Sequence, residues 1–596
     1  MLVKIIPPPG AVTEVDDYSA GKHWTDMDMT RFRMGLPEKM GGWTRFTTST
    51  LTGVPRSIIE WRELDGLRNI ASGTECYLYT IQGGTPYDIT PLRTSSAALG
   101  TDPFATTNAS TTVTVTHTSH GATVDARVIF AGAAAVGGIT IVGTYTIATV
   151  PTLNTYTITH SSAAPSTATG GGAAVTASYT LNCGYASRTK LLGWGAGGWG
   201  ESTWGTARAD SDLFEDLRYW SMDHWGEDLI AARRDGVIYL WDSSAGVGTR
   251  ATAISGAPSQ VNLIAVSSED RHLIAFGAHN GTSYQPLLVR WSDEDDYNTW
   301  TAAATNSAGS KLLESGNQII AVAKARGQHL IWTDDDLFAM QFVGPPFVFE
   351  FQQIGREVGA MGVSSVVVHE DRVFWMSRHG FHVYDGAIRE LECPIKNRVF
   401  DSINVAQYDK VYGGLNEEFN EVIWFYPSVS ATENDRYVIY NYVEDVWSFG
   451  SLARSTWLSQ NLHTDPIATS TGGALFYHES GYDNTSATGG TSAITAYVET
   501  GDMEIGEGDR LFFLNRLIPA NTFGTSTYQM RVSIYTKDYP NDTDTTKGPY
   551  TITSTNTKID TRARGRTFRV RFESTDLAND WRLGMWRANI QPDGRR

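Results

Sequence analysis

The sequence predicts an all-β fold with a β-propeller body, an inserted small β-barrel or sandwich, and a terminal β-sandwich platform. Two observations predict this class. Short hydrophobic segments separated by Gly, Asp and Asn recur along the chain, and no long stretch has the 3.6-residue period of an amphipathic helix. The composition agrees, because glycine makes up 58 of 596 residues and only 19% of residues are charged. A chain of this kind is expected to contain many tight turns.

The propeller is predicted by six similar stretches, each a hydrophobic strand, a polar turn and a second strand that ends on an aromatic residue. Most of them recur every 40–55 residues between about 225 and 480, a spacing typical of propeller blades. Ala474 begins a further segment that would close the series. The alternative is an irregular series of hairpins in stacked sandwiches. The six stretches are Glu75–Asp88, Glu227–Asp242, Asp270–Trp291, Gln328–Phe342, Asp371–Asp385 and Asn420–Tyr442. The best helical candidate is short, Ser211–Trp220.

A change of composition marks the inserted domain. Between Asp102 and Arg188 the only charged residues are Asp125 and Arg127, and Val, Ile and Tyr alternate with Thr. This alternation predicts strands with one buried face, and Ser/Ala/Gly-rich linkers join the module to its neighbours.

The last unit begins near Ala493 and again alternates at period two. In it, Arg569 and Arg571 are expected on one strand face, with Arg566 nearby. The predicted domains are an N-terminal platform arm with the first blade strands (1–93), the insert (94–185), the propeller body (186–490) and the C-terminal sandwich (491–596).

Bulk properties exclude several classes of protein. The net charge of −18 argues against a surface that grips DNA or anionic lipid, although DNA could pass along such a surface without sticking. Three cysteines far apart in the sequence predict no disulfide framework and no Cys₄ zinc site. We expect no secretory leader at the N-terminus and no membrane-spanning segment.

No motif for catalysis, cofactor binding or metal binding is convincing. The G-x-G-x-x-G pattern within Gly193–Gly200 is interrupted by Trp and precedes no helical pattern, so a turn-rich loop is expected. The acidic runs Asp293–Asp296 and Asp334–Asp336, together with Asp502, Glu504, Glu507 and Asp509, lack calcium-loop spacing and are interpreted as solvated turns. His379 and His382 lack further zinc ligands. We therefore expect no catalytic residue, cofactor or metal.

Several segments, taken in chain order, resemble the tail-nozzle (tail-stabilisation) proteins of short-tailed bacteriophages. They cover nearly the whole chain, and the insert departs from the shorter members of that family. These segments are Pro7–Gly10, Gly21–Trp43, Gly83–Arg93, Gly193–Thr206, Trp225–Asp242, Arg290–Thr301 and the terminal GRTFRVRFES…WRLGMWR…PDGRR.

The resemblance implies a structural virion protein without enzymatic activity. Six copies would form a tube below the adaptor ring and portal, extend the DNA channel and hold it shut until ejection. The implied partners are five further copies of the chain, the adaptor protein, tail fibre or spike proteins, and viral DNA that passes through the lumen without sequence-specific binding. The implied location is the virion tail, assembled in the host cytoplasm. The alternative function is a glycan-binding or glycan-cleaving propeller that acts on the host surface.

The two chain ends are expected to lie together in a platform that contacts the adaptor and neighbouring subunits. Large aromatic residues and arginines dominate many protein interfaces, so they are the candidates for assembly contacts. The alternative is that these residues merely fill the core of the terminal sandwich. The candidates are Trp24, Arg31, Trp43, Arg569, Arg571, Trp581 and Trp586.

Overall fold

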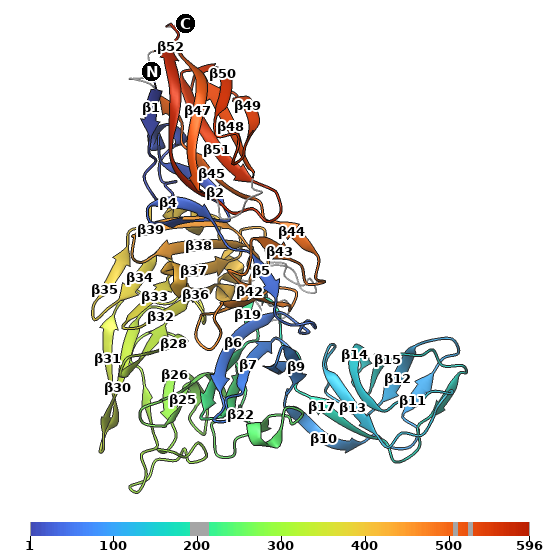
Figure 1. Cartoon of the computed structure of the whole chain (residues 1–596). Helices are drawn as coiled ribbons and strands as arrows, with labels where there is room; N and C mark the ends of the chain where they lie inside the picture. The colour runs from blue at the N-terminus through green and yellow to red at the C-terminus, as the bar shows by residue number, and fades with distance from the viewer. Residues whose placement is uncertain (1, 191–213, 505–509, 523–528, 595–596) are drawn as a thin grey trace, which may run out of the picture. The chain divides into compact units, whose positions relative to one another are not determined.

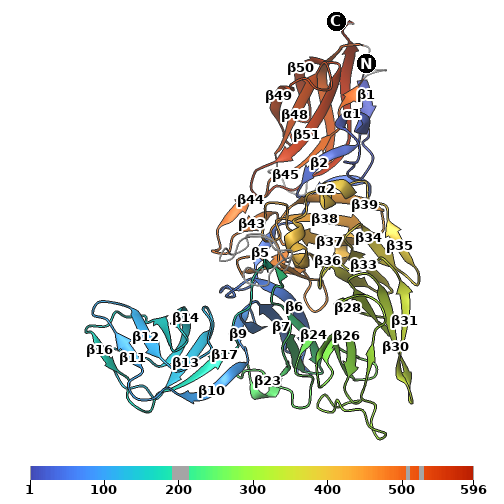
Figure 2. The same cartoon turned by 180° about the vertical axis from the view of Figure 1, so that it is seen from behind.

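The structure is a computed structural model that describes residues 2–190, 214–504, 510–522 and 529–594, and it confirms the all-β prediction (Figures 1 and 2). Over these residues the α-helices are α1 (Asp17–Ala20) and α2 (Lys396–Phe400). Three 3₁₀ turns lie at Ser243–Ala245, Val405–Lys410 and Glu417–Phe419.

The best helical candidate, Ser211–Trp220, is not a helix over its described part. Phe214–Glu215 is the short strand β19, and Trp220 begins strand β20. The indole of Trp220 is buried and donates to the Thr74 carbonyl at 3.0 Å, so packing against a neighbouring sheet decides the conformation here.

The chain divides into two compact units, Leu51–Leu313 and Met1–Thr50 with Glu314–Arg596. The unit Leu51–Leu313 holds three four-stranded antiparallel sheets of the kind found in propeller blades, whose first strands β6, β20 and β24 contact one another in turn. The sheets are β6 (Pro55–Arg62), β7 (Arg68–Thr74), β8 (Leu78–Gln82) and β9 (Thr85–Asp88); β20 (Trp220–Trp225), β21 (Asp228–Arg233), β22 (Ile238–Trp241) and β23 (Thr252–Ala253); and β24 (Val261–Val266), β25 (Leu273–His279), β26 (Tyr284–Trp291) and β27 (Gly309–Leu312).

The other unit repeats this pattern three times, with first strands β28, β32 and β36 again in contact. Its blade-type sheets are β28 (Ile319–Ala325), β29 (Gln328–Thr333), β30 (Leu337–Gly344) and β31 (Val348–Gly355); β32 (Val366–His369), β33 (Arg372–Met376), β34 (Phe381–Tyr384) and β35 (Ile388–Leu391); and β36 (Tyr412–Asn416), β37 (Glu421–Tyr426), β38 (Arg436–Asn441) and β39 (Val446–Ser451).

The predicted hairpins are confirmed. Each of the six stretches contains two paired antiparallel strands, for example β21 with β22 and β37 with β38. Asn420 has a φ of 58°, in the left-handed region that favours Asn, Asp and Gly, just before β37 begins. The blade-type sheets therefore follow from turn residues that the sequence displays. Closure of these sheets into one propeller ring stays a prediction.

The segment at Ala474 lies in a six-stranded sheet that continues the series of blade-type sheets, because the first strand of this sheet contacts β36. β40 (Thr456–Leu458), β41 (Ile467–Thr469) and β42 (Leu475–His478) form a meander, and β5 (Trp43–Arg45) from the N-terminal region supplies the next strand. β43 (Asp483–Thr485) and β44 (Thr491–Ala493) extend this sheet beyond β5. The N-terminal region therefore contributes a strand to this sheet as well as strands to the terminal platform.

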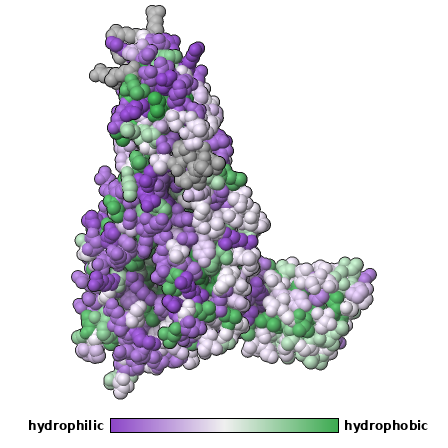
Figure 3. Space-filling view, viewed as in Figure 1, coloured by the Kyte–Doolittle hydropathy of each residue, from purple (hydrophilic) through white to green (hydrophobic). Residues whose placement is uncertain are grey.

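The inserted module forms eight strands with their own apolar core, which draws its buried residues only from Phe104 to Tyr179. Its face in Figure 3 is mostly pale, as expected for a surface rich in Thr, Ser and Ala rather than charges. The strands are β10 (Leu92–Ala98), β11 (Phe104–Thr106), β12 (Thr112–Thr116), β13 (Arg127–Ala131), β14 (Gly143–Thr152), β15 (Thr155–Thr159), β16 (Ala168–Gly170) and β17 (Thr176–Thr180).

A disulfide joins Cys76 to Cys183, so the prediction of a disulfide-free chain is wrong. The two cysteines are 107 residues apart in sequence. The insert brings them together, because its first strand β10 and last strand β17 are antiparallel neighbours and return the chain to its starting point. Separation along the sequence therefore gave no information about their separation in space. Cys393 is free and buried.

The terminal sandwich consists of two six-stranded sheets to which both chain ends contribute. Figure 1 shows the N- and C-termini at the same end of it. One sheet holds β1 (Leu2–Ile5), β3 (Thr30–Arg33), β4 (Leu36–Lys39), β47 (Phe512–Thr522), β50 (Ile559–Gly565) and β52 (Arg582–Pro592). The other holds β2 (Trp24–Asp28), β45 (Ala496–Thr500), β46 (Met503–Glu504), β48 (Met530–Lys537), β49 (Thr545–Ile552) and β51 (Thr567–Ser574).

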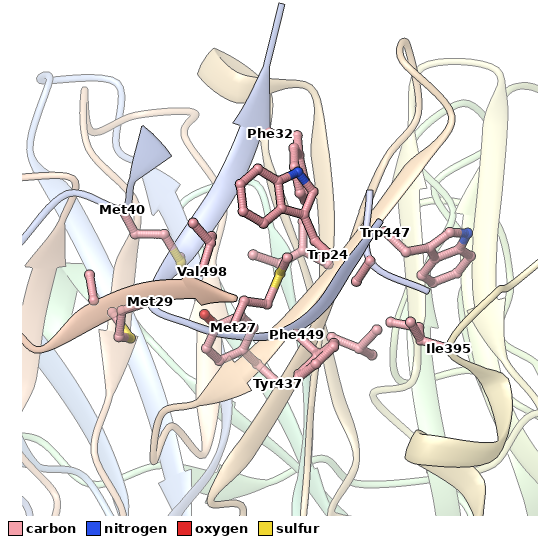
Figure 4. Close-up of a cluster of buried hydrophobic side chains, with 14 of the residues drawn as sticks. Trp24, Met27, Met29, Phe32, Met40, Ile395, Tyr437, Trp447, Phe449 and Val498 are labelled. Atoms are coloured by element: carbon pink, nitrogen blue, oxygen red, sulfur yellow. The ribbon is translucent and has the colours of Figure 1, made fainter. Parts of the chain in front are cut away.

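The N-terminal segment also packs against the last of the three blade-type sheets of its unit. Figure 4 shows Trp24, Met27 and Phe32 among buried side chains that include Tyr437 and Phe449, which come from β38 and β39. One continuous apolar cluster thus links the terminal sandwich to the sheets of its own unit. Residues far apart in sequence share this core, so its stability depends on both chain ends.

Candidate assembly platform

The strand pairings place the two chain ends together, as expected from the sequence. β1 pairs with β52, where Ile5 lies opposite Trp586, and β2 pairs with β45, where Met27 lies opposite Val498. Whether this platform contacts an adaptor or a neighbouring subunit stays a prediction.

The four tryptophans predicted for assembly lie inside the chain's own core. Trp581 and Trp586 have no exposed surface, and Trp24 and Trp43 are 1% and 6% exposed. Phe572 packs across the sandwich against Trp586, with ring centroids 5.9 Å apart. These indoles leave almost no side-chain surface for a neighbouring subunit. Their burial favours the alternative that they fill the core.

Arg31 is also buried, and it holds the N-terminal segment in place by charge. Its Nε lies 3.2 Å from Glu421, its Nη2 bonds Glu479, and its guanidinium lies 3.7 Å from the ring centre of Phe419. Burial alone would lower the pKa of Arg31, but the two carboxylates outweigh burial and raise it. Burial also raises the pKa of Glu421, against the opposing effect of Arg31. A buried charge is tolerated only when it is paired, so this network fixes β3 against two sheets of its unit.

Arg569 and Arg571 lie on one face of β51, as the period-two pattern predicts. Arg569 pairs with Glu499 at 2.8 Å and with Asp544, while the guanidinium of Arg571 lies 3.5 Å from the ring centre of Tyr497. Their side chains are 18% and 23% exposed. Burial alone would lower the pKa of Arg569, but the acidic neighbours raise it. Both arginines are thus already occupied by partners in the same chain.

Exposed apolar residues on the opposite sheet give a different candidate surface. Leu2 of β1 is 50% exposed and lies opposite Asn589, and Ile6, just after β1, is 54% exposed. Met585 of β52 is 37% exposed and precedes Trp586, the partner of Ile5. We define Leu2, Ile6 and Met585 as the β1–β52 surface. Sequence analysis missed it because the alternation of β1 is too short to recognise, and only the pairing with β52 brings these residues together.

The acidic turns are held by internal hydrogen bonds. Asp293 accepts from the Ser307 amide at 2.8 Å and its hydroxyl at 2.7 Å, and Asp296 accepts from Thr299 at 2.6 Å. Burial would raise the pKa of Asp293, but the Ser307 hydrogen bonds outweigh it and lower the pKa. Asp334 similarly accepts from Asn317. These geometries agree with the interpretation as turns, but Asp336 is 5% exposed and is therefore buried rather than solvated.

Two further candidate metal ligands, Asp502 and His382, are also engaged within the chain. Asp502 pairs with Lys537 at 2.5 Å, and the His382 ring lies 3.0 Å from the Ser377 hydroxyl. Burial lowers the pKa of His382. In the part of the chain that the structure describes, no three His, Cys, Asp or Glu side chains gather as a metal site. Glu507, Asp509 and the glycine pattern at Gly193–Gly200 lie outside the described residues.

Of the helices in the described ranges, none has the length and apolar character needed to cross a membrane.

Comparisons with known proteins leave the family open. No family model matches the chain, and no curated protein matches it. Among solved structures, an exo-β-1,3-galactanase from Phanerochaete chrysosporium matches with a TM-score of 0.22 and 8% identity, covering 59% of this chain and 98% of that one. An apocarotenoid oxygenase from Synechocystis matches with a TM-score of 0.27 and 8% identity, covering 55% of this chain and 79% of that one. Likenesses this weak carry no argument about function.

Proposed function

We propose that this chain is the structural subunit of a tail nozzle in a short-tailed bacteriophage. Six copies form a tube that extends the DNA-ejection channel below the portal and adaptor and keeps it closed until ejection. The subunit acts by assembly, without catalysis or a cofactor. Tail fibres or spikes are further partners, and viral DNA passes through the lumen without sequence-specific binding.

The observation that carries the proposal is the ordered resemblance of segments along nearly the whole chain to tail-nozzle proteins. The two chain ends, which carry much of that resemblance, fold into one sandwich. A platform built from both ends supports docking because a rigid two-sheet body can present fixed surfaces to a partner. The net charge of −18 per chain supports a lumen that repels DNA, provided that the acidic residues face inward.

The assembly contact is proposed to use the β1–β52 surface rather than the buried tryptophans. Exposed apolar side chains lose contact with water when a second copy covers them, and a closed ring covers such a surface on every subunit. Lys4 and Arg587 lie opposite each other between these residues. Their side chains would donate hydrogen bonds to polar groups of the neighbouring copy.

The first experiment measures the mass and symmetry of the purified full chain, alone and with DNA-filled heads that carry the adaptor. We expect a species of six times the 65.3 kDa chain mass, with six-fold symmetry in negative stain, under at least one of these conditions. A chain that stays monomeric at micromolar concentration and does not dock onto such heads would contradict the proposal.

The second experiment tests the surface. Ile6→Glu and Met585→Glu should leave the fold intact, as judged by near-UV circular dichroism, and should abolish the hexamer. Leu153→Glu is a matched control, because Leu153 is 82% exposed and lies in the insert. If the control and the two variants assemble equally well, the β1–β52 surface is not the contact, whereas the mass measurement on the unmodified chain still decides the nozzle assignment.

A further inference from the structure

A pocket of about 530 Å³ lies within the unit that contains both chain ends. It is lined by Asp28 of β2, Trp43 of β5, Thr485 of β43 and the loop that joins β39 to β40. Ser451, the last residue of β39, and Arg454 of that loop are among the lining residues. Pockets of this size are large enough for a small organic ligand.

Arg454 is the unusual group in this pocket. It is 5% exposed, and its guanidinium lies 4.8 Å from the ring centre of Trp43 and 5.1 Å from that of Phe476. Its Nε donates to His478 at 2.8 Å and its Nη1 to the Ala453 carbonyl at 2.8 Å. Its Nη2 is buried with no hydrogen-bond partner among the described residues. Two of the three guanidinium nitrogens thus have hydrogen-bond partners, and the third, Nη2, has none among the described residues.

The charge of Arg454 has no counterion among the described residues. His478 accepts the Nε hydrogen bond and is therefore neutral, in agreement with burial and the charge of Arg454, which lower the pKa of His478 well below its ordinary value. Burial lowers the pKa of Arg454 to about 9, so it still carries a positive charge at neutral pH. Arg31 differs in this respect, because it is also buried but pairs with two carboxylates. An unpaired buried charge is costly unless a binding partner supplies the opposite charge.

We propose that this pocket binds a small carboxylate-bearing polyhydroxy ligand of the acidic-sugar class, with the carboxylate on Arg454. This inference goes beyond the nozzle function and does not depend on it. A carboxylate is the expected partner because charge-assisted hydrogen bonds from guanidinium to carboxylate are among the strongest available.

The other residues that line the pocket favour a carboxylate over a phosphate as the bound anion. Asp28 and Asp435 also line the pocket, and their carboxylates would repel a doubly charged phosphate more strongly than a singly charged carboxylate. The same two groups can accept hydrogen bonds from ligand hydroxyls, as can the hydroxyls of Ser451 and Thr485. One cation among several acceptors therefore fits a ligand with one carboxylate and several hydroxyl groups.

The test measures binding of D-glucuronate, D-glucose and inorganic phosphate to the full chain by calorimetry or ligand-observed NMR. We expect glucuronate to bind at least ten times more tightly than either glucose, which lacks the carboxylate, or phosphate. Arg454→Met should weaken glucuronate binding at least tenfold. Arg326→Met is the matched control, because Arg326 is 83% exposed and does not line the pocket, and it should leave binding unchanged.

A second variant keeps Arg454 in place. Thr485→Trp should block the pocket and abolish binding, and it serves as the test if Arg454→Met fails to fold. Absence of glucuronate binding to the unmodified chain overturns the proposal, and so does glucuronate binding that survives Thr485→Trp. Phosphate that binds more tightly than glucuronate overturns the assignment to acidic sugars.

Discussion

The inserted module and the terminal sandwich are both β structures with apolar cores, but their strands come from very different distances along the chain. All strands of the module lie between Leu92 and Thr180. The sandwich combines β1 to β4, within the first 39 residues, with strands that begin only at Ala496. One body is therefore a local element that can be added or removed, whereas the other requires both ends of the chain.

The largest expected effect is removal of residues 1–45. The truncation deletes four sandwich strands, the blade strand β5 and the buried Arg31, which leaves Glu421 and Glu479 without their cation. We expect the truncated chain to be insoluble or to lose the cooperative melting of this unit, as measured by calorimetry. A truncated chain that melts like the full chain would show that the sandwich does not depend on both ends.

Next in size are single core truncations in the two bodies. Trp586→Ala removes a fully buried indole from the sandwich and should cost about 3–5 kcal/mol of its unfolding free energy. Phe130→Ala, in the core of the insert, should cost a similar amount. Hydrogen exchange should show the second loss only within residues 92–180. Protection lost in both bodies after either substitution would mean that they fold as one unit.

The disulfide belongs only to the unit that carries the insert. Replacing both cysteines, Cys76→Ser with Cys183→Ser, should destabilise that unit by about 2–4 kcal/mol, because the bond closes a long loop in the unfolded chain. The melting of the unit that holds the sandwich should not change. Calorimetry with and without reductant measures both effects, and equal destabilisation of the two units would contradict the assignment.

A smaller effect concerns Lys39 of β4, which donates to the carbonyls of Tyr482 at 2.8 Å and Asn579 at 2.6 Å. Burial lowers its pKa to about 8 from an ordinary value of 10.5. Between these values the unfolded chain binds more protons, so stability should rise with pH from about 8 to 10.5. Relative to the Lys39→Met variant, we expect the free energy of unfolding of the unmodified chain to rise by about 1–3 kcal/mol over this pH range. If the free energy of unfolding changes with pH in the same way in the two proteins, the expected contribution of Lys39 is contradicted.

The smallest effect is expected from deleting the insert. The Leu181 amide donates to the Pro91 carbonyl at 3.1 Å, so the ends of a deletion of residues 92–180 lie next to each other. Asp88 would lose Arg127, at 2.6 Å, but keep Arg250, at 3.1 Å. With a short Gly-Ser join, the remaining chain should stay soluble and melt within a few degrees of the original. Aggregation of every such deletion would show that the insert is not autonomous.

Local signals in the sequence predicted most of the strands. The hairpins follow from turn residues such as Asn420, and the single face shared by Arg569 and Arg571 follows from period two. Long-range partners were not predictable in this way. Nothing local in the sequence indicates that Trp43 joins β42, or that Cys183 returns to Cys76. Nor does any motif mark Arg454, since its significance is the absence of a counterion and of a hydrogen-bond partner for Nη2 among the described residues.

The interleaving of the two chain ends also sets an order of events during synthesis. The strands β1 to β4 emerge from the ribosome first, but the strands that pair with them begin at Ala496. At about 5–20 residues per second, the N-terminal segment waits roughly half a minute to a minute and a half with Trp24 and Met27 uncovered. A nascent chain that stops early can therefore never cover these side chains. Only translation of the last strands allows the apolar side chains of β1 to β4 to be buried. Incomplete chains therefore stay recognisable to chaperones and proteases.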